Sequence, residues 1–276
     1  MKWRCKDQIF DLSSQGEIMG IVNVTPDSFS DGGQFDEADA GIKHGLQLME
    51  EGAAIIDIGG ESTRPGADNV ATDEEIRRVL PVIEGILEKA PDACISIDTS
   101  KAPVARAAID AGAKIINDVT GFRDPAMIEL ASKTGVGIAV MHMQGTPRTM
   151  QSDPSYDDVI ADIRSFFEER NATLTAAGIE AKAIVYDPGI GFGKTQEHNL
   201  TLLHRLDQLT LSGRPILLGV SRKSFIGRIL ESDDIGDRNW PTVAITAHAC
   251  FKGVPLHRVH DVKPNLDALR MAEAMR

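Results

Sequence analysis

Tyr186-Asp-Pro-Gly-Ile-Gly-Phe-Gly-Lys-Thr195 is the stretch around which the rest of the chain is organised. A short apolar run from Ala183 to Tyr186 leads to the carboxylate of Asp187. A proline and three glycines at alternate positions follow, and a helical pattern resumes near Gln196. This order predicts a strand, a tight loop and a helix, with Asp187 at the carboxyl end of the strand.

Two phosphate-binding motifs come close to this loop, and both fit it poorly. A Walker A loop needs glycine five residues before Gly193-Lys194-Thr195, but Pro188 stands there and has no N–H to offer a phosphate. A dinucleotide fingerprint needs G-x-G-x-x-G, whereas this loop gives G-x-G-x-G, and no acidic residue closes a second strand about 20 residues later. A glycine-rich connection without a ligand is the remaining alternative, so the rest of the chain decides the role of the loop.

Short β-branched runs alternate with longer amphipathic stretches from Ile18 onward. Eight runs are expected as strands: Ile18–Asn23, Ala54–Gly59, Cys94–Asp98, Lys114–Asp118, Gly137–Met141, Ala183–Asp187, Ile216–Val220 and Leu256–His260. The expected helices are Asp36–Glu51, Asp73–Lys89, Ala102–Ala111, Pro125–Thr134, Asp157–Ala177, Gln196–Leu206, one segment from Ser224 through Phe251, and Pro264–Met275. Apolar strands alternating with helices imply a parallel sheet covered by helices, and eight such units predict an α/β fold, the (β/α)8 TIM barrel. A doubly wound open sheet is the alternative.

The composition agrees with a single domain of this kind. The chain has 276 residues, 42% of them hydrophobic, and no Ser/Gly/Pro-rich linker, repeat or low-complexity tract divides it. We therefore expect one domain over residues 1–276, with the barrel proper from about residue 18 to 276.

Charge and cysteine usage narrow the class of partner and the compartment. A net charge of −12 and a pI near 5.0 argue against nucleic acid or an anionic membrane as the main partner, because both need a basic face. Cys5, Cys94 and Cys250 are odd in number and lack metal-ligand spacing, which indicates a reduced, cytoplasmic protein. The N-terminus lacks the apolar stretch of a signal peptide, and no run approaches the roughly 18 apolar residues of a membrane span.

Polar side chains follow every expected strand at its carboxyl end, where the active site of such a barrel lies. In chain order they are Asn23, Glu61, Thr63 and Arg64, Asp98, Asn117 and Asp118, His142, Asp187, Ser221 to Lys223, and Arg258, His260 and Asp261. Charges in this number are costly unless they pair with one another or bind a ligand. A purely structural ion-pair network across the barrel mouth is the alternative to a binding site.

The deeper polar residues suit a flat heterocycle rich in N–H groups, such as an aminopyrimidine. Asp98, Asn117 and Asp187 offer two acceptors and one group that both donates and accepts. Lys223 follows the seventh strand, where its stem could cover one face of the ring while its ammonium bonds a carbonyl oxygen. A solvated surface lysine is the alternative for Lys223.

Donors for an anion stand closer to the rim, on the side of the barrel that usually binds phosphate: Asn23, Arg64, Arg258 and His260. The spacing of His, Cys and Asp does not resemble a zinc site. A Mg²⁺ ion that bridges a diphosphate needs only one neutral oxygen, such as that of Asn23, together with water. No cysteine stands at a strand end and Ser221 has no base beside it in sequence, so a reaction between two bound substrates is favoured over covalent catalysis.

Seven motifs in the chain closely resemble dihydropteroate synthase, in the order of that family and from about Ile18 to the C-terminus. They are Asn23-Val-Thr-Pro-Asp-Ser-Phe-Ser-Asp-Gly-Gly33, Asp57-Ile-Gly-Gly-Glu-Ser-Thr-Arg-Pro-Gly66, Ser96-Ile-Asp-Thr99, Ile116-Asn-Asp-Val119, Asp187-Pro-Gly-Ile-Gly-Phe-Gly-Lys194, Gly219-Val-Ser-Arg-Lys-Ser-Phe-Ile-Gly227 and Arg258-Val-His-Asp-Val262. The resemblance implies a transferase of folate biosynthesis. Its reaction joins 6-hydroxymethyl-7,8-dihydropterin diphosphate to p-aminobenzoate and releases diphosphate.

The resemblance also implies roles for individual residues, and we expect these roles here. The pterin would be held by Asp98, Asn117, Met141, Asp187, Gly219 and Lys223. The diphosphate and its Mg²⁺ would be held by Asn23, Thr63, Arg258 and His260. The p-aminobenzoate pocket, where sulfonamides compete in this family, would be framed by Phe29, Thr63, Arg64, Pro65, Phe192, Ser221 and Lys223, with Asp27 and Asp31 on a closing loop. The catalytic residues would be Asp31, Asp98, Lys223, Arg258 and His260, in an SN1-like displacement.

The family generally forms homodimers through its late helices, and a homodimer is expected here. Two departures, Trp240-Pro-Thr242 at an expected helix start and Pro255 before the eighth strand, lie outside the seven motifs. Two rival functions share the pterin cluster. A methyltetrahydrofolate:corrinoid methyltransferase domain would not need Ser221-Arg-Lys223 or the anion donors, and a non-catalytic pterin-binding paralogue would be expected to lose a loop or anion residue that this chain retains.

Overall fold

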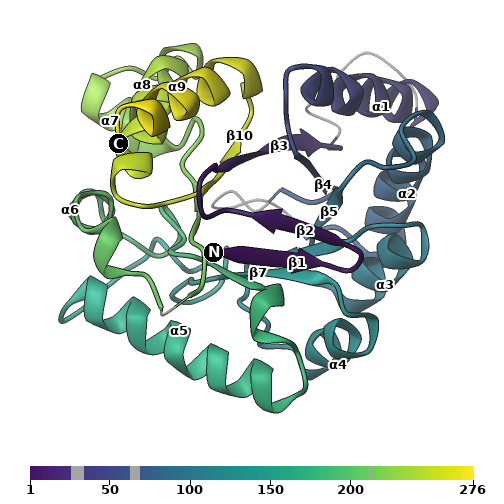
Figure 1. The fold of residues 1–276 in the computed structure, drawn as a ribbon, viewed down its shortest axis with the longest axis horizontal. Helices are drawn as coiled ribbons and strands as arrows, with labels where there is room; N and C mark the ends of the chain where they lie inside the picture. The colour runs from purple at the N-terminus through teal and green to yellow at the C-terminus, as the bar shows by residue number, and fades with distance from the viewer. Residues whose placement is uncertain (26–33, 63–68, 212) are drawn as a thin grey trace.

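Eight parallel strands form a nearly closed barrel in the computed structural model, which describes residues 1–25, 34–62, 69–211 and 213–276 (Figure 1). The barrel strands are β3 Glu17–Asn23, β4 Ile55–Gly59, β5 Ile95–Asp98, β6 Ile115–Asp118, β7 Gly137–Met141, β8 Ile184–Asp187, β9 Leu217–Gly219 and β10 Leu256–Val259. Each lies within one residue of its expected bounds at either end. The TIM-barrel prediction is confirmed.

The seam of the barrel lies between β8 and β9. The hydrogen-bonded strand order runs β8-β7-β6-β5-β4-β3-β10-β9, so β8 and β9 are its two ends. A single parallel bridge, Tyr186 to Ile216, joins them, and Tyr186 N donates to Pro215 O at 3.1 Å. The carboxyl ends of all the barrel strands therefore meet at one mouth.

Helices surround this sheet on the outside (Figure 1). They are α1 Gln34–Glu50, α2 Thr72–Lys89, α3 Ala102–Asp110, α4 Pro125–Thr134, α5 Val159–Ala176, α6 Gln196–His204, α7 Ser224–Leu230, α8 Asn239–Phe251 and α9 Val262–Ala274. Local signals set several ends: Asp124 caps α4 by accepting from Ala126 N, and Gly135 ends it with φ at 64°. None of the described helices has an apolar run long enough to cross a bilayer.

The expected single helix from Ser224 through Phe251 is wrong. Helix α7 ends at Leu230 because Glu231 adopts a left-handed conformation with φ at 52°. A turn follows, in which Asp234 Oδ1 accepts from Gly236 N at 2.8 Å, and α8 begins only at Asn239. A left-handed glutamate is uncommon, so the residue types gave no clear stop signal here.

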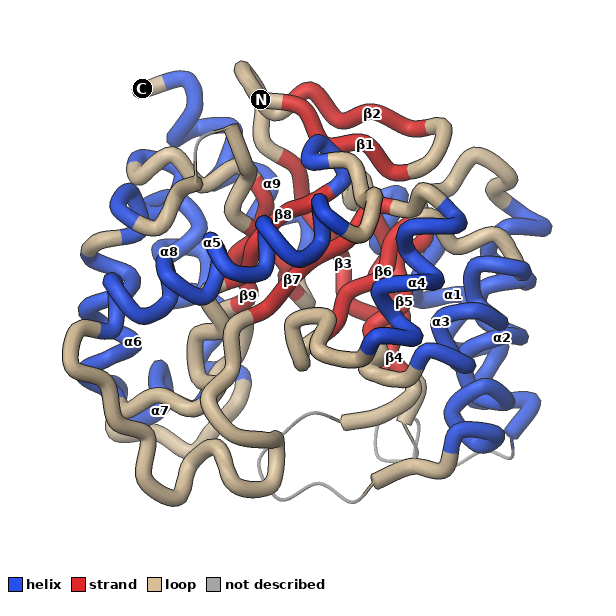
Figure 2. The backbone as a smooth tube through the Cα atoms, turned by 90° about the horizontal axis from the view of Figure 1, so that it is seen from below, coloured by secondary structure: helices blue, strands red, loops and turns tan. Residues whose placement is uncertain are grey.

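A hairpin that was not expected from the sequence closes the amino-terminal end of the barrel. Its strands β1 Lys2–Cys5 and β2 Gln8–Asp11 pair antiparallel, and Figure 2 shows them lying across one end of the barrel. Trp3 is fully buried and its Nε1 donates to Ala183 O at 3.0 Å. The hairpin packs on a layer of inward-facing residues from the barrel strands and the residue before β5: Met19, Ile55, Cys94, Ile115, Ala139, Val185, Leu217 and Leu256. This layer separates the amino-terminal end from the mouth.

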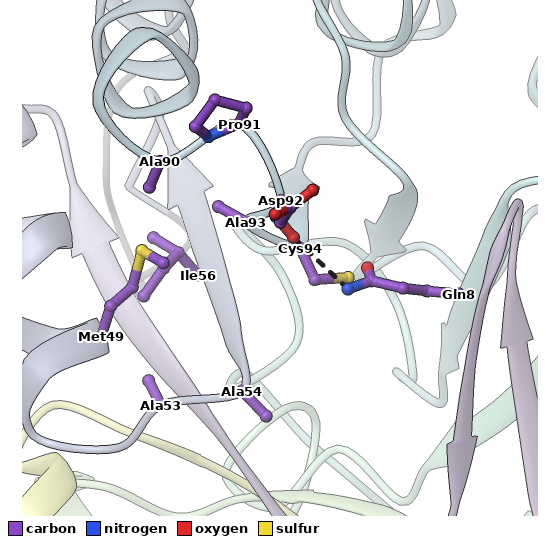
Figure 3. Close-up of a pocket in the computed structure, with 10 residues that line it drawn as sticks. All are labelled: Gln8, Met49, Ala53, Ala54, Ile56, Ala90, Pro91, Asp92, Ala93 and Cys94. Atoms are coloured by element: carbon purple, nitrogen blue, oxygen red, sulfur yellow. Dashed lines mark hydrogen bonds between the residues drawn. The ribbon is translucent and has the colours of Figure 1, made fainter.

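A cavity of about 300 Å³ lies beside the hairpin, against the ends of α1 and α2 (Figure 3). Gln8 of β2 borders it, and its Nε2 donates to Asp92 O at 3.4 Å. Most of the lining is small and apolar, including Ala53, Ile56 and Ala93. Since this cavity is at the amino-terminal end, it is remote from the polar strand ends.

Candidate active site

A buried ion-pair network joins three of the barrel strands at the mouth. Arg258 of β10 donates from Nε to Asp57 Oδ2 at 2.6 Å and from Nη2 to Asp98 Oδ2 at 2.7 Å. Asn117 Nδ2 donates to the same Asp57 oxygen at 3.1 Å. The structure therefore brings Asp98, Asn117 and Arg258 together, as the sequence predicted.

Asp57 is the residue of this network that the sequence reasoning missed. It lies within β4, is fully buried, and begins a motif in which roles were assigned only to Thr63, Arg64 and Pro65. A carboxylate inside an apolar strand was the available signal, because such a group needs a partner. That partner, Arg258, lies 201 residues further along the chain.

Two buried oxygens of the network have no hydrogen-bond partner among the described residues: Asp57 Oδ1 and Asp98 Oδ1. Asp98 and Asn117 pair in register on neighbouring strands, so both side chains face the same side of the sheet. Burial raises the pKa of Asp98, and the Arg258 guanidinium opposes that shift. The mouth thus contains acceptor atoms that the protein itself leaves unsatisfied.

Asp187 lies across the mouth from this network, at the end of β8. Its Oδ1 accepts from Gly189 N at 2.7 Å, and burial raises its pKa while Lys223 opposes the change. Gly219 has no side chain, which leaves a slot beside Asp187 and Arg258. A Cβ placed on Gly219 would lie 3.5 Å from Asp187 Oδ2 and 3.9 Å from Arg258 Cβ. A flat ring entering this slot would contact acceptors on both sides.

The glycine loop after β8 packs tightly on the residues that follow β7. Gly189 has φ at 66°, and a Cβ there would lie 1.9 Å from His142 O. Two of the loop's N–H groups are already used: Gly189 N donates to Asp187, and Gly191 N donates to Asn199 Oδ1 at 2.7 Å. This geometry is unlike a phosphate-binding loop, whose N–H groups point at the ligand.

Lys223 connects the loop after β9 to the glycine loop. Its Nζ donates to Ile190 O and lies 4.7 Å from the centroid of the Phe192 ring. The lysine is only partly exposed, so the solvated-surface alternative does not apply. Phe192 also packs against Val119, Met141, Met143 and Met150, which form an apolar wall beside the acids.

His260 and Ser221 form a pair on the rim. His260 N donates to Ser221 Oγ at 3.1 Å, and His260 Nδ1 lies 2.8 Å from the same hydroxyl. Ser221 is buried and fixes the ring of His260. His260 also borders a cavity of about 570 Å³ that is lined by residues of α1 and α8, so there is open space beside it.

Six predicted site residues lie outside the described residues and their roles stay predictions: Asp27, Phe29, Asp31, Thr63, Arg64 and Pro65. Asn23 is described at the end of β3, in register with Gly59. Among the described residues, no group of three or more His, Cys, Asp or Glu could hold a metal ion. One amide oxygen, from Asn23, fits a Mg²⁺ ion that is bound mainly by a substrate's phosphates and by water.

Comparisons with a protein family, a sequence relative and solved structures agree with the resemblance seen in the seven motifs. The family described as "Pterin binding enzyme" matches residues 19–260. The dihydropteroate synthase of Escherichia coli K12 is 44% identical over 274 residues, covering 99% of this chain and 96% of the relative. A solved Yersinia pestis dihydropteroate synthase in a sulfonamide drug complex has a TM-score of 0.93 at 43% identity, covering 100% of this chain and 99% of that one. The Xanthomonas albilineans enzyme in complex with 7,8-dihydropteroate has a TM-score of 0.89 at 40% identity, covering 100% and 98%. The chain therefore belongs to the dihydropteroate synthase family of pterin-binding enzymes.

Proposed function

We propose that this chain joins 6-hydroxymethyl-7,8-dihydropterin diphosphate to p-aminobenzoate, giving 7,8-dihydropteroate and diphosphate. The observation that carries the proposal is the buried Asp98 Oδ1, which lies in register with Asn117 at the mouth and has no hydrogen-bond partner among the described residues. A buried acceptor without a partner is costly, and the N–H groups of a pterin would satisfy it. The methyltransferase and the non-catalytic paralogue each leave one of two features unexplained, the slot or the anion donors at the rim.

The pterin would lie in the slot between Asp98 and Asp187. Asn117 donates its amide N–H to Asp57, which leaves its Oδ1 as an acceptor for the ring. Asp187 has one oxygen bonded to Gly189 and the other beside Gly219, facing the slot. Met141 would contribute to the apolar wall of the slot and Lys223 would lie over its outer side.

The diphosphate would extend toward Arg258, His260 and Asn23. Two nitrogens of Arg258 are held by acids, so the guanidinium is fixed in place and presents its remaining Nη1 to an anion. Asn23 would be the one protein ligand of Mg²⁺, which would neutralise charge on the leaving diphosphate. We place the C–O bond cleavage ahead of attack by the aromatic amine, because donors fixed before the reaction stabilise the departing anion best.

The amine substrate would lie on the outer side of the slot, between Phe192 and Lys223. The Phe192 ring offers an apolar face, and the Lys223 ammonium above it offers a charge for the carboxylate of p-aminobenzoate. Ser221 would act at this pocket mainly by fixing His260, since its hydroxyl accepts from His260 N and lies 2.8 Å from His260 Nδ1.

Magnesium removal tests the reaction directly. With both substrates and Mg²⁺ present, we expect equimolar release of diphosphate and dihydropteroate, and chelation should lower the rate by at least about 100-fold, as the loss of transition-state charge stabilisation does elsewhere. Both products are followed in the same sample, and re-addition of Mg²⁺ is the control. Pterin binding without product by folded protein would instead favour the non-catalytic paralogue.

The rate should also depend on the protonation of Lys223. Burial lowers the pKa of Lys223 to about 8, and Asp187 opposes this shift. We therefore expect kcat/KM for p-aminobenzoate to fall as the pH rises through about 8, because this ratio reports groups of the free enzyme. The free energy of unfolding changes in the opposite direction. Between about pH 8 and 10.5 the unfolded chain binds more protons than the native state, so the native state becomes more stable as the pH rises.

The pH profile of Lys223→Arg is the control, since a guanidinium stays charged throughout this range. The remaining activity of Lys223→Arg should not decline above pH 8. A flat wild-type profile across the same range would show that the Lys223 ammonium is not required.

We also propose that the chain works as a homodimer. Four apolar side chains on α8 and α9 are exposed, namely Trp240, Phe251, Met271 and Met275, and Trp240 is 76% exposed. Trp240 and Phe251 are 11 residues apart on α8 and so lie on the same helix face. Such a stripe is typical of an interface, and a second copy of the chain is the occupant that the family resemblance suggests.

Light scattering should give about twice the 29.8 kDa mass of one chain, and Trp240→Glu should shift the protein toward the monomer. Ile9→Glu is a matched control, since Ile9 is 60% exposed and lies on the amino-terminal hairpin, outside these helices. A wild-type mass of one chain at micromolar concentration would contradict the dimer.

A reducing, cytoplasmic location completes the proposal. Cys5, Cys94 and Cys250 are all buried free thiols in the structure. Burial raises the pKa of each of these thiols, so they have little thiolate character to support disulfide exchange.

A further inference from the structure

Lys194 is a buried lysine to which the reaction gives no role. It follows the glycine loop after β8 and its side chain is only 1% exposed. Its Nζ donates to Phe192 O at 2.9 Å and to His142 O at 3.5 Å, and lies 3.1 Å from His142 Nδ1. All three partners are uncharged groups, although burying an amino group is costly. An apolar side chain of the same length would avoid that cost, so the hydrogen bonds themselves need an explanation.

The explanation lies in the glycine loop, whose successive carbonyls are each held by a side chain. Ile190 O accepts from Lys223, and Gly191 O accepts from Gln151 Nε2 at 2.6 Å. Phe192 O accepts from Lys194, and Gly193 O accepts from Tyr156 Oη at 2.6 Å. The loop has three left-handed glycines and no regular structure, so these bonds, rather than a helix or sheet ladder, fix its path.

Lys194 also ties this loop to the end of β7. Burial lowers the pKa of His142 to about 2, so its imidazole is neutral and Nδ1 can accept a hydrogen bond from Lys194 Nζ. His142 N in turn donates to Asp187 O at 2.9 Å. The bonds of Lys194 thus set the position of the Phe192 backbone relative to the strand that holds Asp187.

We propose that Lys194 is a positioning residue for the amine pocket: by holding Phe192 O and His142, it keeps the Phe192 ring against Lys223. The inference rests on the proposed function, in which p-aminobenzoate binds between Phe192 and Lys223. Lys194 touches neither substrate in this arrangement. Its effect passes through the ring of Phe192, 4.7 Å from Lys223 Nζ.

Lys194→Met tests this role because methionine keeps most of the side-chain length and removes every donor. We expect KM for p-aminobenzoate to rise about tenfold, with kcat and KM for the pterin diphosphate changed less than about twofold, which is the pattern of lost ground-state binding. The unfolding midpoint should change little, because the removed cost of burying the amino group offsets the hydrogen bonds lost at Phe192 O and His142. Lys114→Met is the matched control: Lys114 is a 15% exposed lysine that pairs with Asp7 at 3.2 Å, next to the amino-terminal hairpin, and its loss should change neither KM.

A double-mutant cycle separates positioning from an independent effect. In a Phe192→Leu background, whose own KM for p-aminobenzoate is raised, Lys194→Met should add less than about twofold, since the two residues act through one contact. A full tenfold effect in both backgrounds, or none in the wild-type background, would overturn the inference. A fall in kcat and stability together, with KM unchanged, would show a merely structural lysine.

If Lys194→Met does not fold, Tyr156→Phe serves as the second variant. It keeps the ring and removes the one hydroxyl donor to Gly193 O, so a selective rise of about threefold in KM for p-aminobenzoate is expected, and an unchanged KM would count against the loop mechanism. A wild-type protein that forms no dihydropteroate would overturn the reaction and this inference together. An active wild type with an unaltered Lys194→Met would overturn the inference alone.

Discussion

Replacing Arg258 with glutamine is expected to lower kcat/KM for the condensation by about 10³-fold, the range found when one well-placed donor to a developing anion is removed. Arg258 is the cation between Asp57 and Asp98, and its third nitrogen, Nη1, bonds neither acid and would donate to the leaving diphosphate. Glutamine keeps a donor for one of the acids but removes the charge. The rate is measured with both substrates saturating and then at low substrate, so that kcat and kcat/KM are separated.

Arg258→Gln should also lower stability, and by an amount that depends on pH. The structure places this guanidinium between two buried acids, so its removal affects folding as well as turnover. Breaking such a pair costs about 3–5 kcal/mol when a charge is left buried. Asp98 can take up a proton instead, because burial raises its pKa.

The sign follows from proton binding. A native carboxyl with a raised pKa binds more protons than the unfolded chain above the ordinary pKa, so stability falls as the pH rises toward the raised value. Without Arg258 to oppose this shift, the variant should lose more stability relative to the wild type at pH 8 than at pH 5.5. The free energy of unfolding of both proteins is measured by urea denaturation at each pH. Arg270→Gln is the control, since Arg270 pairs with Glu17 and Glu273 beside the amino-terminal end. If the rate falls only in proportion to the fraction of protein that is unfolded, Arg258 has a structural role and not a catalytic one.

The barrel itself was predictable because its signals are local. Each strand is a short apolar run that ends in a polar residue, and each helix that follows has its own periodicity and caps, so the strand ends could be placed within one residue. The gathering of Asp98, Asn117, Asp187 and Arg258 then follows from the rule that parallel strands bring their carboxyl ends to one face.

The missed features depend on contacts between distant residues. In the sequence, Asp57 is a charged residue within an apolar strand and has no partner nearby. Its partner, Arg258 of β10, is brought to it only by the fold. The amino-terminal hairpin did carry a signal, because Lys2 to Cys5 alternates charged and apolar residues, but a strand of four residues is too short to stand out. Lys194 was weighed only as part of a phosphate motif, and its actual partners are carbonyls and a histidine fixed by the tertiary fold.

The mouth of the barrel combines two environments that favour different charge states. Around Arg258 the acids are balanced by a cation in direct contact. The charge of Asp187 is balanced only at longer range, by Lys223, Arg258 and Lys194. A ligand that brings N–H groups to Asp187 would therefore stabilise its ionised form, and would gain the strength of a charge-assisted bond. This difference makes Asp187 the sharper test of pterin recognition.

Asp187→Asn should weaken binding of the pterin substrate by about 10²–10³-fold, because a charge-assisted bond is lost and a donor is left facing donors. An asparagine that keeps its oxygen on Gly189 N must turn its NH₂ toward the slot, where the ring also presents N–H groups. The fold should not lose stability near pH 8, since a buried charge has been removed.

Asp118→Asn makes the same change at the end of β6, two strands from β8, where the carboxylate accepts from Thr120 N at 2.8 Å and from Phe122 N at 2.8 Å. That control should lower the unfolding midpoint and leave pterin affinity within about threefold, since its bonds serve only its own loop. Calorimetric titration with the pterin and thermal unfolding of both variants would separate recognition from stability. Equal pterin affinity in Asp187→Asn and the wild type would remove Asp187 from the site, and with it the reason for a ring bound at this depth.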